Sequence, residues 1–262
     1  MSFFNQKSDY ALSKSGVASS NFLSLIDEPY EESFEIFKAQ GLEFIEHKGR
    51  YYYATAFCDV DDATFCIVDI ETNGSRPNKH QIIEIGAIKI KNRTIIETYE
   101  SLVQCESISS HISNITGITV DDTANAPTLD QVMQEFRTFL GNDIFVAHDV
   151  KFDYSFISAM MQRVGLEPLM NRSLCTIDLA ERTISAYRYG LAYLNRQLDL
   201  YGDATHHRAL SDAMTAAKLF KKTLQFLPQS IESAEDLIRF SKEASRLKRP
   251  KFDPEVLEAN ES

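Results

Sequence analysis

The sequence has little that would place it in a membrane or outside the cell. None of its apolar runs approaches the ~18 residues that a membrane-spanning helix requires. Its first residues, MSFFNQKSDYALSKSG, lack the apolar segment of a secretory signal. The four cysteines are scattered without a C-x-x-C pair, which argues against a disulfide framework and a thiolate zinc site. These absences predict a cytoplasmic protein with no membrane segment.

Positive charge is also scarce. The chain has 27 Lys and Arg against 38 Asp and Glu, a formal net charge of −11. Such a chain does not grip nucleic acid with its whole surface, because that mode of binding depends on neutralising phosphates. The charge is compatible with an enzyme that brings phosphate to carboxylates through bound cations.

Hydrophobic periodicity divides the 262 residues into three parts. Residues 1–62 form an N-terminal extension: its first 20 residues have no sustained period and are expected to lack fixed structure. A helix over 31–39 and a hairpin that turns at 47–50 then form a small helix-hairpin appendage. Residues 63–228 are the main domain, and residues 229–262 are a charged, partly helical C-terminal tail.

The main domain has the pattern of an α/β fold. Apolar strands over 65–71, 82–90 and 94–103, the last two joined by a short polar turn, predict an antiparallel meander. Short strands over 144–147 and 173–178 then alternate with helices. The result is a predicted mixed sheet with helices on both faces.

Two acids interrupt the first of these strands, FCIVDIE. Asp69 and Glu71 are two residues apart, so a strand projects both to the same side. A lone D-x-E is often only a strand end that emerges into solvent. Like charges held this close would repel and drive at least one carboxylate to protonate, unless a cation lies between them.

Two further acids follow at comparable places. Asp153 comes after the strand at 144–147, at the beginning of a helix, and Asp212 lies near the start of a later helix. Carboxylates that converge from one sheet and two helix starts suit hard divalent cations such as Mg²⁺ or Mn²⁺. Two such ions could bridge one phosphate, which predicts phosphodiester chemistry.

His207 stands five residues before Asp212. On one continuous helix that offset would separate the two side chains by about 140°, so His207 is expected in the preceding loop. A loop histidine can accept a proton from water because its pKa is near neutral. The alternative is an ordinary surface histidine.

Three segments in order, VDIETNG with IIEIGAIKI, FVAHDVKFDYSFI and HRALSDA, resemble the three motifs of the DEDD exonuclease superfamily in its histidine-bearing branch. The similarity extends to the proofreading epsilon subunit of bacterial DNA polymerase III. It implies an RNase H-like fold with a five-stranded mixed sheet, and 3′-to-5′ removal of nucleotides.

The resemblance also assigns roles. Asp69, Glu71, Asp153 and Asp212 would bind two divalent metal ions, His207 would be the general base, and Thr72, Asn73 and Gly74 would lie near the terminal nucleotide. The sequence departs from the family at one position. Asp149 replaces the usual Asn, either as the N-cap of the next helix or as added negative charge near the metals.

The expected partners are a single-stranded DNA 3′ end and a DNA polymerase catalytic subunit. QLDLYG at 197–202 resembles a sliding-clamp peptide, but inside the domain Leu198 and Leu200 are interpreted as structural. Two alternatives remain: a 3′-to-5′ exoribonuclease of the same branch, and an inactive scaffold that binds a polymerase. Intact acids argue against the scaffold.

Overall fold

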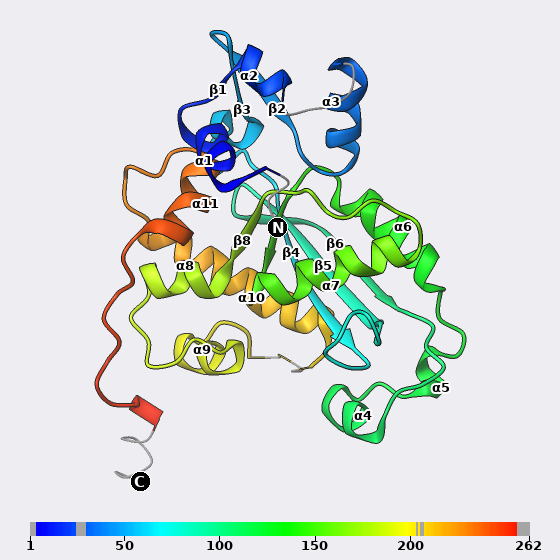
Figure 1. The fold of residues 1–262 in the computed structure, drawn as a ribbon. Coiled ribbons are helices and arrows are strands. Elements are labelled where there is room, and N and C mark those ends of the chain that lie inside the picture. Colours follow the sequence, from blue (N-terminus) through cyan, green and yellow to red (C-terminus); the bar gives the residue numbers. More distant parts are fainter. Residues whose placement is uncertain (1–3, 25–29, 203, 205–206, 256–262) are drawn as a thin grey trace.

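The computed structural model describes residues 4–24, 30–202, 204 and 207–255. A five-stranded sheet lies at its centre (Figure 1). The order of its strands is β6-β5-β4-β7-β8. The strands are β4 (Phe65–Thr72), β5 (Ile82–Lys91), β6 (Thr94–Leu102), β7 (Ile144–Ala147) and β8 (Ser173–Cys175). The first three form an antiparallel meander, whereas β7 and β8 run parallel to β4. The predicted mixed sheet is confirmed.

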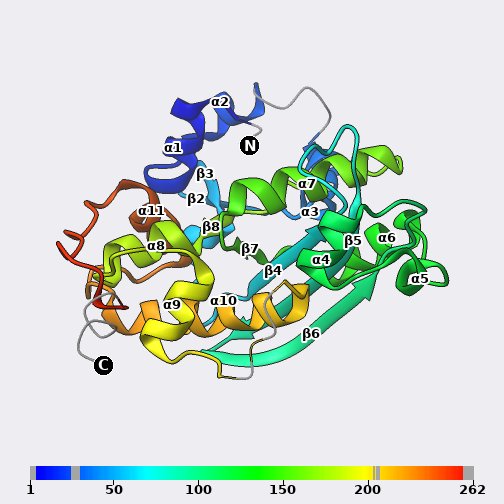
Figure 2. The ribbon, with the colours of Figure 1, turned by 90° about the horizontal axis from the view of Figure 1, so that it is seen from below.

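Helices cover both faces of this sheet (Figure 2). The helices on one face are α6 (Leu129–Leu140) and α7 (Val150–Arg163), and those on the other are α8 (Thr176–Thr183), α10 (Ala209–Thr223) and α11 (Ala234–Glu243). Alternate residues of β4 enter two different cores, because side chains alternate along a strand: Val68 packs on the α6 side and Ile67 on the α10 side. The connections hold α4 (Ser110–Thr116), α5 (Val120–Thr123) and α9 (Leu191–Leu198).

The local sequence of helix α6 accounts for its start, its buried face and its end. Its N-cap Thr128 accepts a hydrogen bond from the backbone N–H of Gln131, whose side chain bonds back to the N-cap. The apolar residues at helical spacing are fully buried against the sheet: Val132, Met133, Phe136 and Leu140. The helix ends before Gly141, as predicted.

The N-terminal extension is more ordered than its sequence predicts. The elements before the main domain are α1 (Gln6–Lys14), β1 (Val17–Ala18), α2 (Ser19–Leu23), α3 (Tyr30–Ala39), β2 (Phe44–His47), β3 (Arg50–Tyr53) and η1 (Ala54–Phe57). The helix and hairpin are confirmed, but the expectation that residues 1–20 lack fixed structure is wrong for those described. Leu12 and Phe22 are fully buried in an aromatic cluster with Tyr51, so contacts from a distant segment order them.

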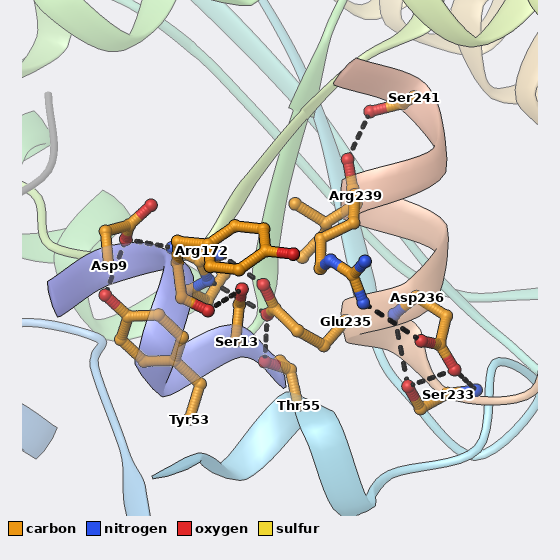
Figure 3. Close-up of polar contacts among 12 residues, drawn as sticks. Asp9, Ser13, Tyr53, Thr55, Arg172, Ser233, Glu235, Asp236, Arg239 and Ser241 are labelled. Atoms are coloured by element: carbon orange, nitrogen blue, oxygen red, sulfur yellow. Dashed lines mark hydrogen bonds and ion pairs between the residues drawn. The ribbon is translucent and has the colours of Figure 1, made fainter. Parts of the chain in front are cut away.

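A polar network joins this extension to the main domain (Figure 3). The Arg172 guanidinium donates to Glu235 of α11 and, at 3.1 Å, to Asp9 of α1, and it lies 4.0 Å from the centre of the Tyr53 ring. The Tyr53 hydroxyl donates to Asp9 at 2.6 Å, and Thr55 donates to Glu235 at 2.6 Å. We call these five residues the Arg172 cluster. It connects α1, β3, η1, the start of β8 and α11.

The segment predicted as a charged tail contains α11, in which Leu237 and Ile238 are fully buried in the core on the α10 side. The division at residues 62 and 228 stays a prediction. Leu198 and Leu200 pack against the cluster around α9, which confirms that they are structural. Among the described residues, no helix is both long enough and apolar enough to span a membrane.

Candidate active site

Strand β4 presents Asp69 and Glu71 on the face of the sheet that α10 covers, because they alternate with residues of the other face and share the side of Phe65 and Ile67. Across the antiparallel pair, Asp69 lies opposite Gly86, and Glu71 lies opposite Glu84 of β5. The two acids are therefore held at the carboxyl end of β4, beside the first turn of α10.

Asp153 reaches the same place from α7. It lies in the first turn of that helix and is only 4% exposed. Its carboxylate accepts hydrogen bonds from its own backbone N–H and from that of Ile70, the residue between the two acids of β4. Burial raises the pKa of Asp153 to about 8 despite these bonds, and the charges of Asp149 and Glu71 add to the shift.

Asp212 and His207 come from α10 and the turn before it. Asp212 is in the first helical turn and is 9% exposed, and its Oδ2 accepts the backbone N–H of His207 at 2.8 Å. His207 is exposed, with a left-handed φ of +63°, so its loop position is confirmed. Metal-ligating atoms of Glu71, His207 and Asp212 all lie within 4.8 Å of one another.

The charges of these acids act on one another. Burial raises the pKa of Asp69 well above its ordinary range, and the carboxylates of Asp153, Asp212, Glu71 and Glu84 raise it further, in that order. Burial also raises the pKa of Glu71 to about 7, together with Asp212 and Glu84, and against the nearby Arg208 guanidinium. The charges of the four predicted acids thus act on one another, and Asp153 and Asp212 are buried whereas Asp69 and Glu71 are partly exposed.

This cluster suits divalent cations. Its carboxylate oxygens are the ligands that Mg²⁺ and Mn²⁺ prefer, and the His207 imidazole lies beside them. Burial is the main cause of the raised pKa values of Asp153 and Glu71, and repulsion from neighbouring carboxylates adds to it. A bound cation would remove that repulsion.

Comparison with known proteins agrees with this geometry. An exonuclease family model of the RNase T type matches residues 66–220, which contain every predicted site residue. The chain belongs to this exonuclease family. The resemblance to the DEDD exonucleases is confirmed, and so is the RNase H-like fold.

Relatives of this exonuclease include DNA polymerase III PolC-type proteins. The protein from Staphylococcus haemolyticus is 38% identical over 170 residues, which are 64% of this chain and 12% of that protein. The one from Thermotoga petrophila is 34% identical over 189 residues, 69% of this chain and 14% of that protein. The chain therefore spans about an eighth of the length of these relatives.

Two solved structures share the fold. Exonuclease X in complex with 5′ overhanging duplex DNA has a TM-score of 0.54 at 25% identity, covering 68% of this chain and 99% of that one. Exonuclease I of E. coli with a dA16 oligonucleotide has a TM-score of 0.57 at 16% identity, covering 64% and 42%. The second shows the fold alone.

The three residues predicted to lie near the nucleotide begin the loop after β4. The Asn73 side chain joins that loop to the segment after β6: its Oδ1 accepts the Gln81 backbone N–H at 2.8 Å, and its Nδ2 donates to Ser107 O at 2.9 Å. A Cβ added to Gly74 would clash with the His80 ring. The contacts of Thr72, Asn73 and Gly74 with a nucleotide stay predictions.

Sequence reasoning missed Glu84 and Arg208. Glu84 is fully buried beside the predicted acids, and the Arg208 guanidinium bonds to its carboxylate. The signal was present in IIEIGAIKI, an apolar strand with one internal acid, the same anomaly that singled out Asp69. Asp149 is the N-cap of α7 by position, with a φ of +71°, but its side chain makes no capping bond.

A cavity of about 620 Å³ lies elsewhere, between the extension, α7 and α11. Arg172 and Lys242 are among its lining residues, and none of the predicted site residues is. The candidate active site is thus the acidic cluster and not this cavity.

Proposed function

We propose that this exonuclease removes nucleotides from the 3′ end of single-stranded or frayed DNA by two-metal-ion hydrolysis. The observation that carries the proposal is the convergence of Asp69, Glu71, Asp153 and Asp212, from one strand and two helix starts, beside an exposed histidine. We further propose that it serves proofreading by a bacterial replicative DNA polymerase. Its relatives named DNA polymerase III PolC-type support that role.

Each site residue has a distinct role in this proposal. The four acids would hold two Mg²⁺ or Mn²⁺ ions, which supply positive charge to neutralise the scissile phosphate. His207 would take a proton from the attacking water, since its ring is exposed and its backbone is tethered to Asp212. His148 is less suited to act as the base, because its Nδ1 lies 2.9 Å from Thr176 Oγ1 and burial lowers its pKa to about 4.

A labelled-strand assay tests direction and substrate together. A 5′-labelled single-stranded DNA should give a ladder that shortens from the 3′ end, and a 3′-labelled strand should release its label first. Both reactions should require Mg²⁺ or Mn²⁺ and stop with EDTA. Internal cuts, or release from the 5′ end, would contradict the proposed direction.

The same assay separates DNA from RNA. A DNA strand and an RNA strand of equal sequence should differ in rate, with DNA degraded faster. Faster digestion of RNA would favour the exoribonuclease alternative instead. A primer with a mismatched 3′ terminus should lose its last nucleotide faster than a matched primer, because the unpaired end reaches the site without the energy of base unpairing.

A further inference from the structure

Glu84 is a fifth acid in the site, and the proposed chemistry does not use it. It lies on β5 directly opposite Glu71 and is fully buried. Its charge raises the pKa values of Glu71 and Asp69, so it adds to the repulsion in the cluster. A neutral side chain would avoid this electrostatic cost.

The bonds of Glu84 all lead to the start of α10. Its Oε1 accepts Nη2 of Arg208 at 2.6 Å and Nε at 3.0 Å, and its Oε2 accepts the backbone N–H of Ala209 at 2.8 Å. The carboxylate therefore fixes both the side chain of the N-cap residue and the first N–H of the helix.

Gly86 allows a close backbone contact between β5 and the start of α10. A Cβ at this position would clash with the backbone of Ala209 and Leu210, so α10 begins directly against the backbone of β5. Gly86 lies opposite Asp69. Two neighbouring positions of β5 on the same face, 84 and 86, thus set where α10 starts.

The same turn carries the reacting groups. The N–H of Asp212 donates to the carbonyl of Arg208 at 2.9 Å, and the N–H of His207 donates to the Asp212 carboxylate at 2.8 Å. Movement of Arg208 would therefore move the predicted base and one predicted metal ligand together. Buried ion pairs contribute little net stability compared with apolar packing, so stability alone is a weak reason for this one.

We propose that Glu84 and Arg208 are positioning residues, which hold His207 and Asp212 in register with Glu71 through the first turn of α10. This inference rests on the proposed function for its catalytic consequence. Misplacement of a reacting group by ~1 Å can cost about 10²-fold in rate, so the pair would act on turnover without contacting the nucleotide.

The test compares two buried glutamates. Glu84→Gln removes the charge at the site, and Glu235→Gln makes the same change in the Arg172 cluster, where Glu235 is 1% exposed and also binds an arginine. Each variant is measured for its Tm, for kcat and KM on a 5′-labelled single-stranded DNA, and for Mn²⁺ affinity by calorimetry. Hydrogen exchange of the backbone amides at 207–212 is followed as well.

We expect both variants to lower Tm. Only Glu84→Gln should lower kcat, by about 10- to 100-fold, with KM changed less than about threefold. Only this variant should also weaken Mn²⁺ binding and speed hydrogen exchange of the backbone amides at 207–212. An equal loss of kcat in both variants, or unchanged exchange at 207–212 in Glu84→Gln, would overturn the inference.

If Glu84→Gln does not fold, a second variant tests the positioning role of the Glu84–Arg208 pair. Arg208→Lys keeps the charge but not the two-pronged contact, and the Arg208 side chain is 43% exposed, so the fold should tolerate it. It should lower kcat by about tenfold and speed exchange at 207–212. If the unaltered protein has no nuclease activity, the proposed function fails. Hydrogen exchange at 207–212 and Mn²⁺ affinity would still show whether Glu84 and Arg208 hold the start of α10 in place.

Discussion

Glu235 and Glu84 are both buried and both bind an arginine, but they lie in regions that differ in charge balance. In the Arg172 cluster, the Arg172 guanidinium has two acidic partners, Glu235 and Asp9, and the face of the Tyr53 ring. At the active site, Arg208 forms its ion pair with Glu84 and, among the described residues, with no other acid, although the four predicted acids lie close by. One region is nearly neutral, and the other keeps an excess of negative charge.

This difference suggests different roles: the Arg172 cluster stabilises the fold, and the acidic cluster serves function. The Arg172 cluster contains a hydrogen bond between residues 180 apart in the sequence, and the charges of Arg172, Glu235 and Asp9 are paired within the chain. In the acidic cluster, burial together with repulsion between carboxylates raises the pKa of Asp153 to about 8 and that of Glu71 to about 7. Folding alone does not favour such an arrangement, whereas cation binding does.

The largest effect is expected when one acid of the active site is removed. Asp69→Ala or Asp212→Ala should abolish hydrolysis, because each removes a predicted metal ligand. Asp69→Ala should not lower the Tm of the metal-free protein, since one source of repulsion is lost, whereas Asp212→Ala also removes the acceptor of the His207 N–H. Turnover on a labelled DNA strand and thermal unfolding in EDTA measure the two quantities.

The opposite result should follow in the Arg172 cluster. Glu235→Ala leaves the buried Arg172 with less compensation and should cost on the order of 3 kcal/mol of stability. The kcat of the molecules that remain folded should be unchanged. Loss of turnover in Glu235→Ala at a temperature where the protein is folded would contradict the separation of stability from function in the two regions. Full activity in Asp69→Ala would contradict it as well.

A smaller loss is expected at His207. His207→Ala should lower kcat by about 10²- to 10⁴-fold, the usual contribution of a general base. Its effect on Mn²⁺ affinity should be smaller than that of Asp212→Ala, which removes a buried carboxylate. A rate equal to that of the unaltered protein would show that His207 is not the base.

Much of the fold could be predicted because short-range patterns determine it. The strands of the meander, α6 and the loop position of His207 follow from side-chain periodicity and from one helix offset. The four acids could be placed together because two lie near the end of one strand and two lie in the first turns of helices. Local sequence carries all of this information.

Contacts between distant segments could not be predicted in the same way. Leu12 and Phe22 have a weak local pattern, and they are ordered by aromatic residues of α3 and the hairpin. Glu84 gave a visible signal, an acid within an apolar strand, but its partner Arg208 is 124 residues away. Sequence spacing alone does not show which acids of a cluster bind metal and which bind the chain.

The excess charge at the active site should also appear in the stability of the metal-free protein. The pKa values of Glu71, about 7, and Asp153, about 8, lie above those of unfolded carboxyl groups. Between about pH 5 and 8 the folded chain therefore keeps protons that the unfolded chain has lost, so stability falls as pH rises.

Thermal unfolding in EDTA should show this as a Tm that falls by about 3 °C or more from pH 5.5 to 8.5. Saturating Mn²⁺ should reduce this dependence of Tm on pH, because the cation stabilises the ionised carboxylates. Asp153→Asn should flatten it without metal. A metal-free Tm that rises over this interval would contradict the charge balance inferred for the site.

The smallest expected effect concerns Asp149, an exposed acid whose charge raises the pKa of Asp153. Asparagine tolerates the φ of +71° at this N-cap, so Asp149→Asn should leave Tm unchanged at pH 5.5. With that charge gone, Asp153 should lose its proton at a lower pH, by roughly half a unit for one exposed charge. The fall of the metal-free Tm with rising pH should therefore end at a lower pH, whereas Glu235→Gln, a charge change far from the site, should not move that end point. An end point at a higher pH in Asp149→Asn would contradict the effect of the Asp149 charge on Asp153.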